Sequence, residues 1–464
     1  MDVKIITNSS FFDDFMDIVR AFAPYVNYSE EGEEITINIC ENFIDLCAKN
    51  YAKKESFYVE NLSKIKQKSE IKRLAKIMLY DYLSTSTNIK LPYGSLTGIR
   101  PTKLYHELTR KGENAYDYFL NYLRVSRGAC DLIKNICDNQ EGVYSICDDE
   151  IDFFVNIPIC TTRCSYCSFI SAEYGKIKKI IPNYVDMLCR EIEKSFEIVE
   201  KYNYKLRSIY VGGGTPTSLS EKDFARVMTL LKDRNVVEFT VEAGRPDTIT
   251  REKLDIMRDC GVTRISINPQ TFNDKTLKTI GRAHLSEDIY RVYNMAKEYD
   301  FIINMDLIAM LPNESLEDFI YSVDECIKLS PDNITVHTLA IKKGSNLKLN
   351  SYDNKIEKLP FEMLDYSKKA LYNAGYEPYY MYKQKYMSGN LENTGFSKKG
   401  KECVYNIDIM EETHNIIASG AGGISKRVFN SENRLERLAN PKGIDVYLER
   451  EDKIFEEKDE FFKK

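Results

Sequence analysis

The stretch IDFFVNIPICTTRCSYCSF (residues 151–169) joins a strand-like apolar run to three closely spaced cysteines. Cys160, Cys164 and Cys167 are separated by three and then two residues. A closed zinc site needs a fourth Cys or His ligand, and no histidine lies near this loop in the sequence. A redox Cys-x-x-Cys pair would use Cys164 and Cys167 and leave Cys160 without a role. Three thiols in one loop therefore need another explanation.

The strand that precedes these cysteines is the first of six strand–helix repeats. The strand candidates are residues 151–157, 206–214, 236–243, 263–270, 301–308 and 333–341. Helical periodicity marks residues 182–202, 221–233, 250–260, 286–299 and 315–329. Parallel neighbours need a crossover connection, which is usually a helix, so this alternation predicts an α/β fold. We expect residues 149–345 to form an incomplete (β/α)6-type barrel, with Ser286 and Ser315 as helix caps and Gly261 as a helix stop.

The regions on either side do not continue this alternation. Residues 1–148 predict a separate N-terminal α+β domain, with strands at 2–7 and 33–43, helices at about 11–22 and 64–83, and a loop at 91–108. Residues 346–464 form a C-terminal extension that ends in the charged stretch LEREDKIFEEKDEFFKK (448–464). We expect that stretch to be a solvated amphipathic helix.

Charge and hydropathy exclude several classes of protein. The chain has 464 residues, of which 43% are hydrophobic and 29% charged, as in a globular protein. The apolar run FIINMDLIAML (301–311) is too short to span a bilayer and contains Asp306. The N-terminus lacks the basic and apolar regions of a secretory signal, so we expect a cytoplasmic protein with reduced cysteines. A formal charge of −6 argues against nucleic acid as the main partner.

Three thiolates in one loop suit a 4Fe–4S cluster, in which each thiolate binds one iron. The fourth iron then has no protein ligand and can chelate an amino acid. S-adenosylmethionine is held in this way for reductive cleavage to a 5′-deoxyadenosyl radical. The position of the loop supports this interpretation, because loops after the strands form the active-site face of such barrels.

Glycines and polar residues recur at the following strand ends. In IYVGGGTPT (209–217), Gly212, Gly213 and Gly214 permit close backbone approach, and the GKS/T ending of a P-loop is absent. Because these glycines follow the next strand after the cysteine loop, they predict backbone hydrogen bonds to the methionine amino and carboxylate groups. The other strand-end residues are Glu242, Gln270, Arg282 and Asp306. A carboxylate suits ribose hydroxyls and Arg suits a carboxylate, although each residue alone could equally be a structural polar cap.

These motifs resemble those of a known family. CTTRCSYC is similar to the CxxxCxxC signature of radical S-adenosylmethionine enzymes, and GGGTP resembles their amine-contact motif. The wider pattern resembles the oxygen-independent coproporphyrinogen III oxidase group, which includes a haem-chaperone branch, and is most similar to HemZ-type coproporphyrinogen dehydrogenases. The resemblance runs through the segments 94–104, 264–284, 304–312, 335–345 and 389–412.

The resemblance implies a radical-SAM barrel with two cofactors. It implies cluster ligation by Cys160, Cys164 and Cys167. It implies S-adenosylmethionine contacts from Gly212, Gly213, Gly214, Thr215, Glu242, Gln270, Arg282 and Asp306. The implied reaction is oxidative decarboxylation of two propionates of coproporphyrinogen III to vinyls, giving protoporphyrinogen IX without oxygen in haem biosynthesis. The oxidases have Tyr and His before the first ligand and a further Cys after the third. Here Phe154, Asn156 and Phe169 stand at those positions, and these departures bear on the substrate.

The resemblance also implies partners. A tetrapyrrole with four carboxylates requires cationic side chains near the barrel mouth, where residues 346–464 are expected to form a substrate site or cap. The candidates are Lys342, Lys343, Lys383 and Lys385, each of which could instead be a solvated surface lysine. Flavodoxin or ferredoxin is the expected reductant. Its expected docking patch is the basic run of Lys176, Lys178 and Lys179.

Two other hypotheses remain open. One is a haem-binding chaperone that keeps the cluster without decarboxylation. Its axial ligand would come from the cysteines or from His106, His284, His337 and His414. The other is a radical enzyme acting on another substrate, such as RNA, recognised by residues 1–148. GIRPTKLYHELTRKG (98–112) is locally basic and keeps that hypothesis open.

Overall fold

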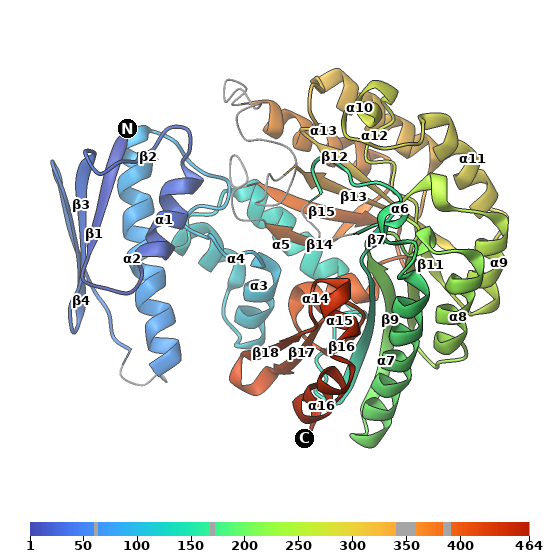
Figure 1. The fold of residues 1–464 in the computed structure, drawn as a ribbon. Helices are drawn as coiled ribbons and strands as arrows, with labels where there is room; N and C mark the ends of the chain where they lie inside the picture. The colour runs from blue at the N-terminus through green and yellow to red at the C-terminus, as the bar shows by residue number, and fades with distance from the viewer. Residues whose placement is uncertain (60–63, 168–171, 340–357, 384–390, 464) are drawn as a thin grey trace. The chain divides into compact units, whose positions relative to one another are not determined.

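The computed structural model describes residues 1–59, 64–167, 172–339, 358–383 and 391–463. The chain divides into two compact units (Figure 1). The N-terminal unit comprises Met1–Asp138, Asp353–Pro360 and Met381–Asn393, and the barrel unit comprises Asn139–Tyr352, Phe361–Tyr380 and Thr394–Lys464. Among the described residues, no helix has the length and apolarity needed to cross a membrane.

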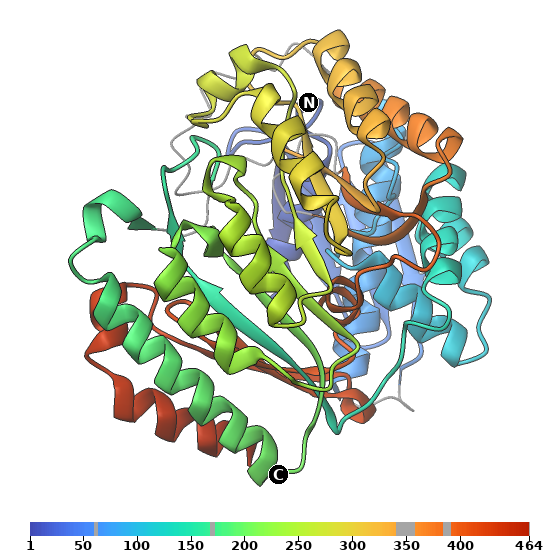
Figure 2. The ribbon, with the colours of Figure 1, turned by 90° about the vertical axis from the view of Figure 1, so that its right-hand side faces the viewer.

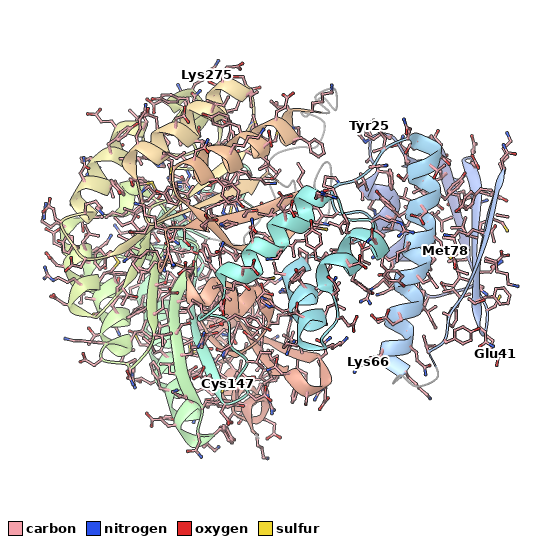
Figure 3. All side chains as sticks on the ribbon, turned by 180° about the vertical axis from the view of Figure 1, so that it is seen from behind. Tyr25, Glu41, Lys66, Met78, Cys147 and Lys275 are labelled. Carbon is pink, nitrogen blue, oxygen red and sulfur yellow. The ribbon has the colours of Figure 1, made fainter. Side chains whose placement is uncertain are left out.

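The N-terminal unit begins with a five-stranded sheet in the order β2-β1-β3-β4-β5. Its strands are β1 (Asp2–Thr7), β2 (Asn27–Tyr28), β3 (Glu33–Ile39), β4 (Phe43–Ala48) and β5 (Tyr51–Ser56). The helices α1 (Phe12–Ala21) and α2 (Lys64–Thr87) lie on the same side of this sheet (Figure 1). Phe15 on α1 and Met78 on α2 are fully buried in the shared core, and Figure 3 labels Met78 on its helix.

A second core in this unit is built from short helices. These are α3 (Pro101–Arg110), α4 (Ala115–Asp117), a π-helical turn (Tyr118–Tyr122) and α5 (Arg127–Asn139). The expectation of a loop over residues 91–108 is therefore wrong from Pro101 onward. A proline at the first helical position suits a helix start, because its fixed φ is already helical and its missing N–H would be unpaired there anyway.

The barrel unit is organised around parallel strands, and the expected α/β fold is confirmed. Within the described residues, one sheet has the order β14-β15-β13-β12-β11-β10-β9-β6-β16-β17-β18. Its parallel strands are β6 (Glu150–Ile157), β9 (Lys205–Gly213), β10 (Glu238–Glu242), β11 (Arg264–Ser266), β12 (Ile302–Ala309), β13 (Asn333–Thr338) and β16 (Asn415–Ser419). The order of the described strands is open at both ends, which is the geometry of an incomplete barrel.

Helices follow the strands as the alternation predicts. They are α7 (Ile181–Lys201), α8 (Glu221–Leu231), α9 (Arg251–Asp259), α10 (Asp274–Thr279), α11 (Ser286–Ala296) and α12 (Leu316–Leu329). They cover the outer face of the sheet (Figure 2). Each of α7, α8, α9, α11 and α12 buries one apolar stripe.

The C-terminal part of the chain contributes to the same sheet. β16 pairs in parallel with β6, Asn415 opposite Ile151 and Ser419 opposite Val155, although the sequence analysis predicted no strand there. The run NIIAS is short, and no crossover helix directly follows it. The remaining strands are β14 (Glu377–Lys383), β15 (Glu392–Ser397), β17 (Ile424–Phe429) and β18 (Arg434–Ala439). The remaining helices are α13 (Leu359–Asn373), α14 (Val404–Glu411), α15 (Ile444–Leu448) and α16 (Glu451–Phe462).

Helix α16 corresponds to the charged C-terminal stretch. The expected amphipathic helix is present, and its polar face is solvated, but its other face is buried against the protein. Ile454, Lys458 and Phe462 are buried, and α16 lies along α7 (Figures 1 and 2). Residues at these spacings share one helix face, and that face is covered.

The predicted caps hold in part. Ser315 caps α12: its hydroxyl accepts the Asp318 N–H at 3.2 Å, and the Asp318 carboxylate accepts the Ser315 N–H at 3.0 Å. Gly261 follows α9 with φ of +81°, as a helix stop requires. Ser286 does not cap α11, because it is already the first helical residue. Its N–H instead donates to Asp274 at 2.7 Å.

The amino-terminal end of the barrel is filled by side chains from distant segments. Arg264, at the start of β11, is 2% exposed and pairs with Glu238 at the start of β10, 3.1 Å away. The same guanidinium donates to the carbonyls of Lys401 and Glu402, both at 3.0 Å. These contacts fix the start of α14 and direct Tyr405 into the barrel, so the carboxyl ends of the strands are left for a site.

Candidate functional site

The three cysteines lie directly after the carboxyl end of β6. Cys160 ends the short strand β7 (Ile159–Cys160), which pairs with β8 (Ala172–Glu173). Cys164 is buried, and the Cys167 N–H donates to its carbonyl at 3.1 Å. Phe169 lies outside the described residues.

Two neighbouring loops hold the cysteine loop in place. The Thr162 hydroxyl donates to the Gly281 carbonyl at 3.2 Å, and the Ser165 N–H donates to the Ile280 carbonyl at 3.0 Å. Thr161 donates to Asp247, which follows β10, at 3.1 Å. The loop is therefore tied to the ends of two further barrel strands.

The sulfur atoms are not arranged for a single metal ion. Among the described residues, no group of three or more His, Cys, Asp or Glu side chains could hold one ion. A 4Fe–4S cubane does not need three ligands around one ion, because each thiolate binds a different iron. The donor set fits such a cubane: three cysteines lie in one loop, with the Thr215 hydroxyl 3.4 Å from the Cys160 sulfur and the Arg245 Nη1 4.0 Å from the Cys164 sulfur.

The glycine run lies against the strand that leads to the cysteines. Gly212 and Gly213 end β9 opposite Asn156 and Ile157. A Cβ on Gly213, where φ is +104°, would lie 2.2 Å from the Asn156 Oδ1, so no side chain fits there. The Gly214 N–H donates to the Ile157 carbonyl at 2.9 Å, and the Thr215 N–H donates to the Ile159 carbonyl at 2.8 Å.

These backbone bonds limit what the run can offer a ligand. The N–H groups of Gly214 and Thr215 already donate to carbonyls within the protein. The run can offer a ligand carbonyl oxygens and the Thr215 hydroxyl, which suit an ammonium group.

Carboxylates at the next strand ends form a polar cluster. The Tyr210 hydroxyl donates to the Glu242 Oε1 at 2.6 Å. Burial is the main cause that raises the pKa of Glu242 to about 7; nearby Asp306 also raises it, while Tyr210 and His337 oppose the shift. Asp306 accepts from Asn304 at 2.9 Å and lies 3.6 Å from the His337 Nε2.

Gln270 is held by backbone pairing with β12. Its N–H donates to the Asp306 carbonyl, and its carbonyl accepts from Ile308, both at 2.9 Å. Its φ of +68° lies in the left-handed region, which glutamine rarely adopts. This strain places Gln270 beside Asp306 at the strand ends.

Arg282 lies beside the cysteine loop. Its Nη1 donates to the carbonyls of Asn268 at 2.7 Å and Gly244 at 3.1 Å, and its Nη2 lies 3.4 Å from the Tyr166 hydroxyl. Among the described residues, its buried Nε has no hydrogen-bond partner, nor has the buried Oδ1 of Asn268. Unpaired buried polar atoms are rare, and two at one site fit a place that a polar cofactor completes.

Several residues at this site are not evident from the sequence. Arg245, Asp247 and Asn268 lie at or just after the ends of predicted strands, in GRPD and INPQ, and His284 in GRAH is expected only as a possible haem ligand. Tyr405 could not be found, because it comes from a distant segment. Its ring stacks on Tyr210 with centroids 4.4 Å apart and on Phe154 at 6.1 Å.

The lysines proposed for the substrate are mostly outside the described residues, namely Lys342, Lys343 and Lys385. Lys383 is described in the N-terminal unit and does not fit that role. Its side chain is 2% exposed and donates to the Leu96 carbonyl at 2.7 Å. Burial lowers its pKa to about 7.

Known proteins are similar to this chain in sequence. Residues 156–326 match the Radical SAM superfamily. Over 426 residues the chain is 35% identical to the oxygen-independent coproporphyrinogen-III oxidase-like protein HemZ of Bacillus subtilis (strain 168), covering 87% of this chain and 83% of the relative. Over 323 residues it is 28% identical to the heme chaperone HemW of Buchnera aphidicola subsp. Acyrthosiphon pisum (strain APS), covering 66% of this chain and 81% of the relative.

A solved structure shares the fold. Coproporphyrinogen III oxidase (HemN) from Escherichia coli, described as a radical SAM enzyme, aligns with a TM-score of 0.52 at 21% identity. The alignment covers 69% of this chain and 73% of that chain. Proteins of this superfamily use a 4Fe–4S cluster and S-adenosylmethionine. The cysteine loop, the open parallel sheet and the similarity over most of the length lead to one conclusion: the chain belongs to the HemN/HemZ family of radical SAM enzymes.

Proposed function

We propose that this protein carries out the oxygen-independent oxidative decarboxylation of coproporphyrinogen III propionates to vinyls, giving protoporphyrinogen IX in haem biosynthesis in the cytoplasm. The observation that carries the proposal is the 35% identity to HemZ over 87% of the chain. Residues 149–345 would hold the cofactors, and residues 346–464 would help to form the tetrapyrrole site.

Cofactor binding follows from the contacts at the strand ends. Cys160, Cys164 and Cys167 would each bind one iron of the 4Fe–4S cluster. With S-adenosylmethionine bound and one electron from an external reductant, the cluster held by these cysteines would supply a 5′-deoxyadenosyl radical. The carbonyls of Gly212, Gly213 and Gly214 and the Thr215 hydroxyl would accept from the methionine ammonium group.

The other side chains would orient the nucleoside and the carboxylate. Glu242 would accept from the ribose hydroxyls in its ionised form, with the Tyr210 hydroxyl holding the carboxylate in position. Asp306, which accepts a hydrogen bond from Asn304, would lie beside the nucleoside together with Gln270. The free Nε of Arg282 would pair with the methionine carboxylate.

Two observations bear on the substrate. The described part of the barrel interior is aromatic and acidic, with Tyr210, Tyr405, Glu242 and Asp306. Propionates need cations, so Lys342, Lys343 and Lys385 stay the proposed contacts and Lys383 does not. Aromatic rings such as that of Tyr405 suit a flat tetrapyrrole by stacking.

A haem chaperone is the second candidate function. It is supported by relatives named heme chaperone HemW and by Phe154 and Asn156 at the positions where the oxidases have Tyr and His. An axial ligand must be accessible. His284 and His414 are 1% exposed, whereas the His337 side chain is 23% exposed. Of the three histidines in the barrel unit, His337 is therefore the one that we propose for haem ligation in this alternative.

One anaerobic experiment separates the candidates. The reconstituted protein is mixed with S-adenosylmethionine, dithionite and coproporphyrinogen III, and 5′-deoxyadenosine, carbon dioxide and tetrapyrrole masses are followed. The proposal expects successive losses of carboxyl groups that vanish in a Cys160→Ala/Cys164→Ala/Cys167→Ala variant. An unchanged tetrapyrrole mass with abundant 5′-deoxyadenosine would contradict it and indicate another substrate.

The chaperone alternative has its own readout. Haem added to the protein would give a Soret band that shifts in His337→Ala but not in His106→Ala, without loss of carbon dioxide. A band that is the same in all three proteins would exclude His337 as the ligand.

A further inference from the structure

A buried arginine contacts the cysteine loop at the sulfur that is most enclosed. Arg245, three residues beyond Glu242, is 2% exposed. Its Nη1 donates to the Thr162 carbonyl at 3.1 Å and the Thr162 hydroxyl at 2.9 Å, and lies 4.0 Å from the Cys164 sulfur. One guanidinium nitrogen therefore contacts both the backbone of the cysteine loop and the thiol of Cys164.

A single carboxylate faces the other side of this guanidinium. Asp247 accepts from the Arg245 Nε at 3.1 Å and from the Thr161 hydroxyl at 3.1 Å, and the His284 Nδ1 lies 3.8 Å away. Burial would raise the pKa of Asp247, but His284, Arg245 and Thr161 hold it well below its ordinary value. Asp247 is therefore ionised at neutral pH and offsets part of the Arg245 charge.

The backbone behind the pair is rigidly held. The Arg245 carbonyl accepts from the Thr248 hydroxyl at 2.8 Å, and the Thr248 hydroxyl lies 2.7 Å from that of Thr217. The buried Lys253 ammonium donates to the carbonyls of Thr217 and Thr248. A charge fixed in this way cannot swing away from the loop when the charge of the loop changes.

We propose that Arg245 raises the reduction potential of the cluster bound by Cys160, Cys164 and Cys167, and that Asp247 limits the rise. The inference rests on the proposed ligation of the cluster. Reduction adds one electron, taken from a one-electron reductant such as dithionite, and no bond forms or breaks. The added negative charge lies next to a buried cation and a donor to sulfur, two factors that set such potentials. Arg245 stabilises the reduced state, and Asp247 opposes it.

The competing interpretation is that the pair only braces the loop. Loss of either partner would then loosen the loop and expose the cluster to water, moving the potential in the same direction in both variants. The electrostatic role predicts shifts of opposite sign. Asp247→Asn is nearly identical in shape to the parent and tests charge with little change in packing. Arg245→Gln removes the charge but also shortens the side chain, so it is read together with Arg245→Lys, which keeps the charge.

The experiment is an anaerobic redox titration of the reconstituted full-length protein, followed by electron paramagnetic resonance of the reduced cluster. At the midpoint potential of the parent, Arg245→Gln should show about a tenfold lower ratio of reduced to oxidised cluster, equal to about 59 mV for one electron. Asp247→Asn should show a higher ratio than the parent. Arg245→Lys keeps the charge but not the planar set of guanidinium donors. Its ratio of reduced to oxidised cluster should lie between those of Arg245→Gln and the parent. The exposed Arg251, paired with Glu298 on the surface, provides the control Arg251→Gln, which should match the parent.

The outcomes separate this inference from the proposed function. If the parent protein binds no 4Fe–4S cluster, both the proposed function and this inference are wrong. A parent that binds the cluster, with Arg245→Gln at the same potential or both variants shifted the same way, overturns this inference alone. If Arg245→Gln fails to fold or to bind iron, Asp247→Asn decides: a higher potential supports the inference, and an equal or lower one overturns it.

Discussion

Two residues at the barrel mouth show how the site departs from the related oxidases. Phe154 has no hydroxyl, but the neighbouring Tyr210 supplies one, which donates to Glu242. Asn156 is held between two loops: its Nδ2 donates to the Ala421 carbonyl at 2.5 Å, and its Oδ1 fills the space beside Gly213. The hydroxyl beside Glu242 is therefore supplied by Tyr210 and not by residue 154.

Glu242 leads to a prediction about pH. Its pKa is raised to about 7 mainly by burial, whereas an unfolded chain has a glutamate pKa near the ordinary value of 4.5. The folded state thus favours the protonated form, and this stabilisation is lost as pH rises from about 4.5 through 7. Glu242→Gln keeps an acceptor for Tyr210 without the charge. We expect the variant to match the cofactor-free parent near pH 4.5 and to exceed it by up to about 3 kcal/mol in free energy of unfolding at pH 8.

Urea unfolding monitored at several pH values, under reducing conditions, measures this difference. The matched control is Glu252→Gln on the exposed start of α9, which should follow the parent throughout. A Glu242→Gln difference that does not grow with pH would show that Glu242 is an ordinary solvated carboxylate.

At the scale of elements, α16 is attached to α7 by a buried ion pair. Lys458 on α16 lies 2.5 Å from Glu191 on α7, and both side chains are at most 1% exposed. Glu191 also accepts from the Gly420 N–H and the Asn440 amide, both at 2.7 Å. The exposed pairs along the same two helices, Arg190–Glu451 and Lys201–Asp459, contribute little by comparison. The buried pair therefore explains why a highly charged helix packs against the barrel.

Removing one partner of this pair should be costly. Lys458→Met leaves Glu191 buried without its cation, and we expect a loss of about 3 kcal/mol in free energy of unfolding. Lys453→Met, at a residue whose side chain is 61% exposed, should lose less than about 0.5 kcal/mol. Chemical denaturation of the three proteins checks this.

A double variant tests the cause. Glu191→Gln/Lys458→Met removes both charges, so it should be more stable than Lys458→Met alone. If the double variant is the less stable of the two, packing of the lysine stem rather than the unpaired charge explains the loss.

At the scale of the whole molecule, charge is distributed unevenly. The chain carries a net −6, yet Lys176, Lys178 and Lys179 are all exposed a few residues beyond the cysteine loop. Glu173 neutralises one of them in part, at 2.8 Å from Lys176. An acidic reductant would be repelled by the chain as a whole and attracted by this run, which favours approach near the cluster.

Charge reversal tests this docking. In Lys176→Glu/Lys178→Glu/Lys179→Glu, we expect cluster reduction by flavodoxin to slow about tenfold at low salt and to approach the parent rate at high salt, because salt screens exposed charges. Reduction by dithionite should not change. Stopped-flow absorbance measures both rates, with Lys222→Glu/Lys232→Glu/Lys297→Glu as an equal change of charge elsewhere on the barrel unit. Equal slowing in the two triple variants would show that net charge, and not this run, controls the approach.

The sequence alone determined what depends on near neighbours in the chain. The strand–helix alternation predicts the six parallel strands, and the spacing of Cys160, Cys164 and Cys167 predicts a cluster loop at the end of the first. Periodicity also indicates the C-terminal helix. These features could be read because secondary structure, turn geometry and ligand spacing are set over a few residues.

Only the tertiary structure decided which distant residues meet. It places Tyr405 on Tyr210, β16 beside β6, Lys458 on Glu191, and Arg245 and Asp247 at the cysteine loop. Each contact depends on burial and charge pairing between segments far apart in the chain, and no local pattern encodes such a pairing. A lysine in a charged helix looks the same in the sequence whether its partner is water or a buried carboxylate.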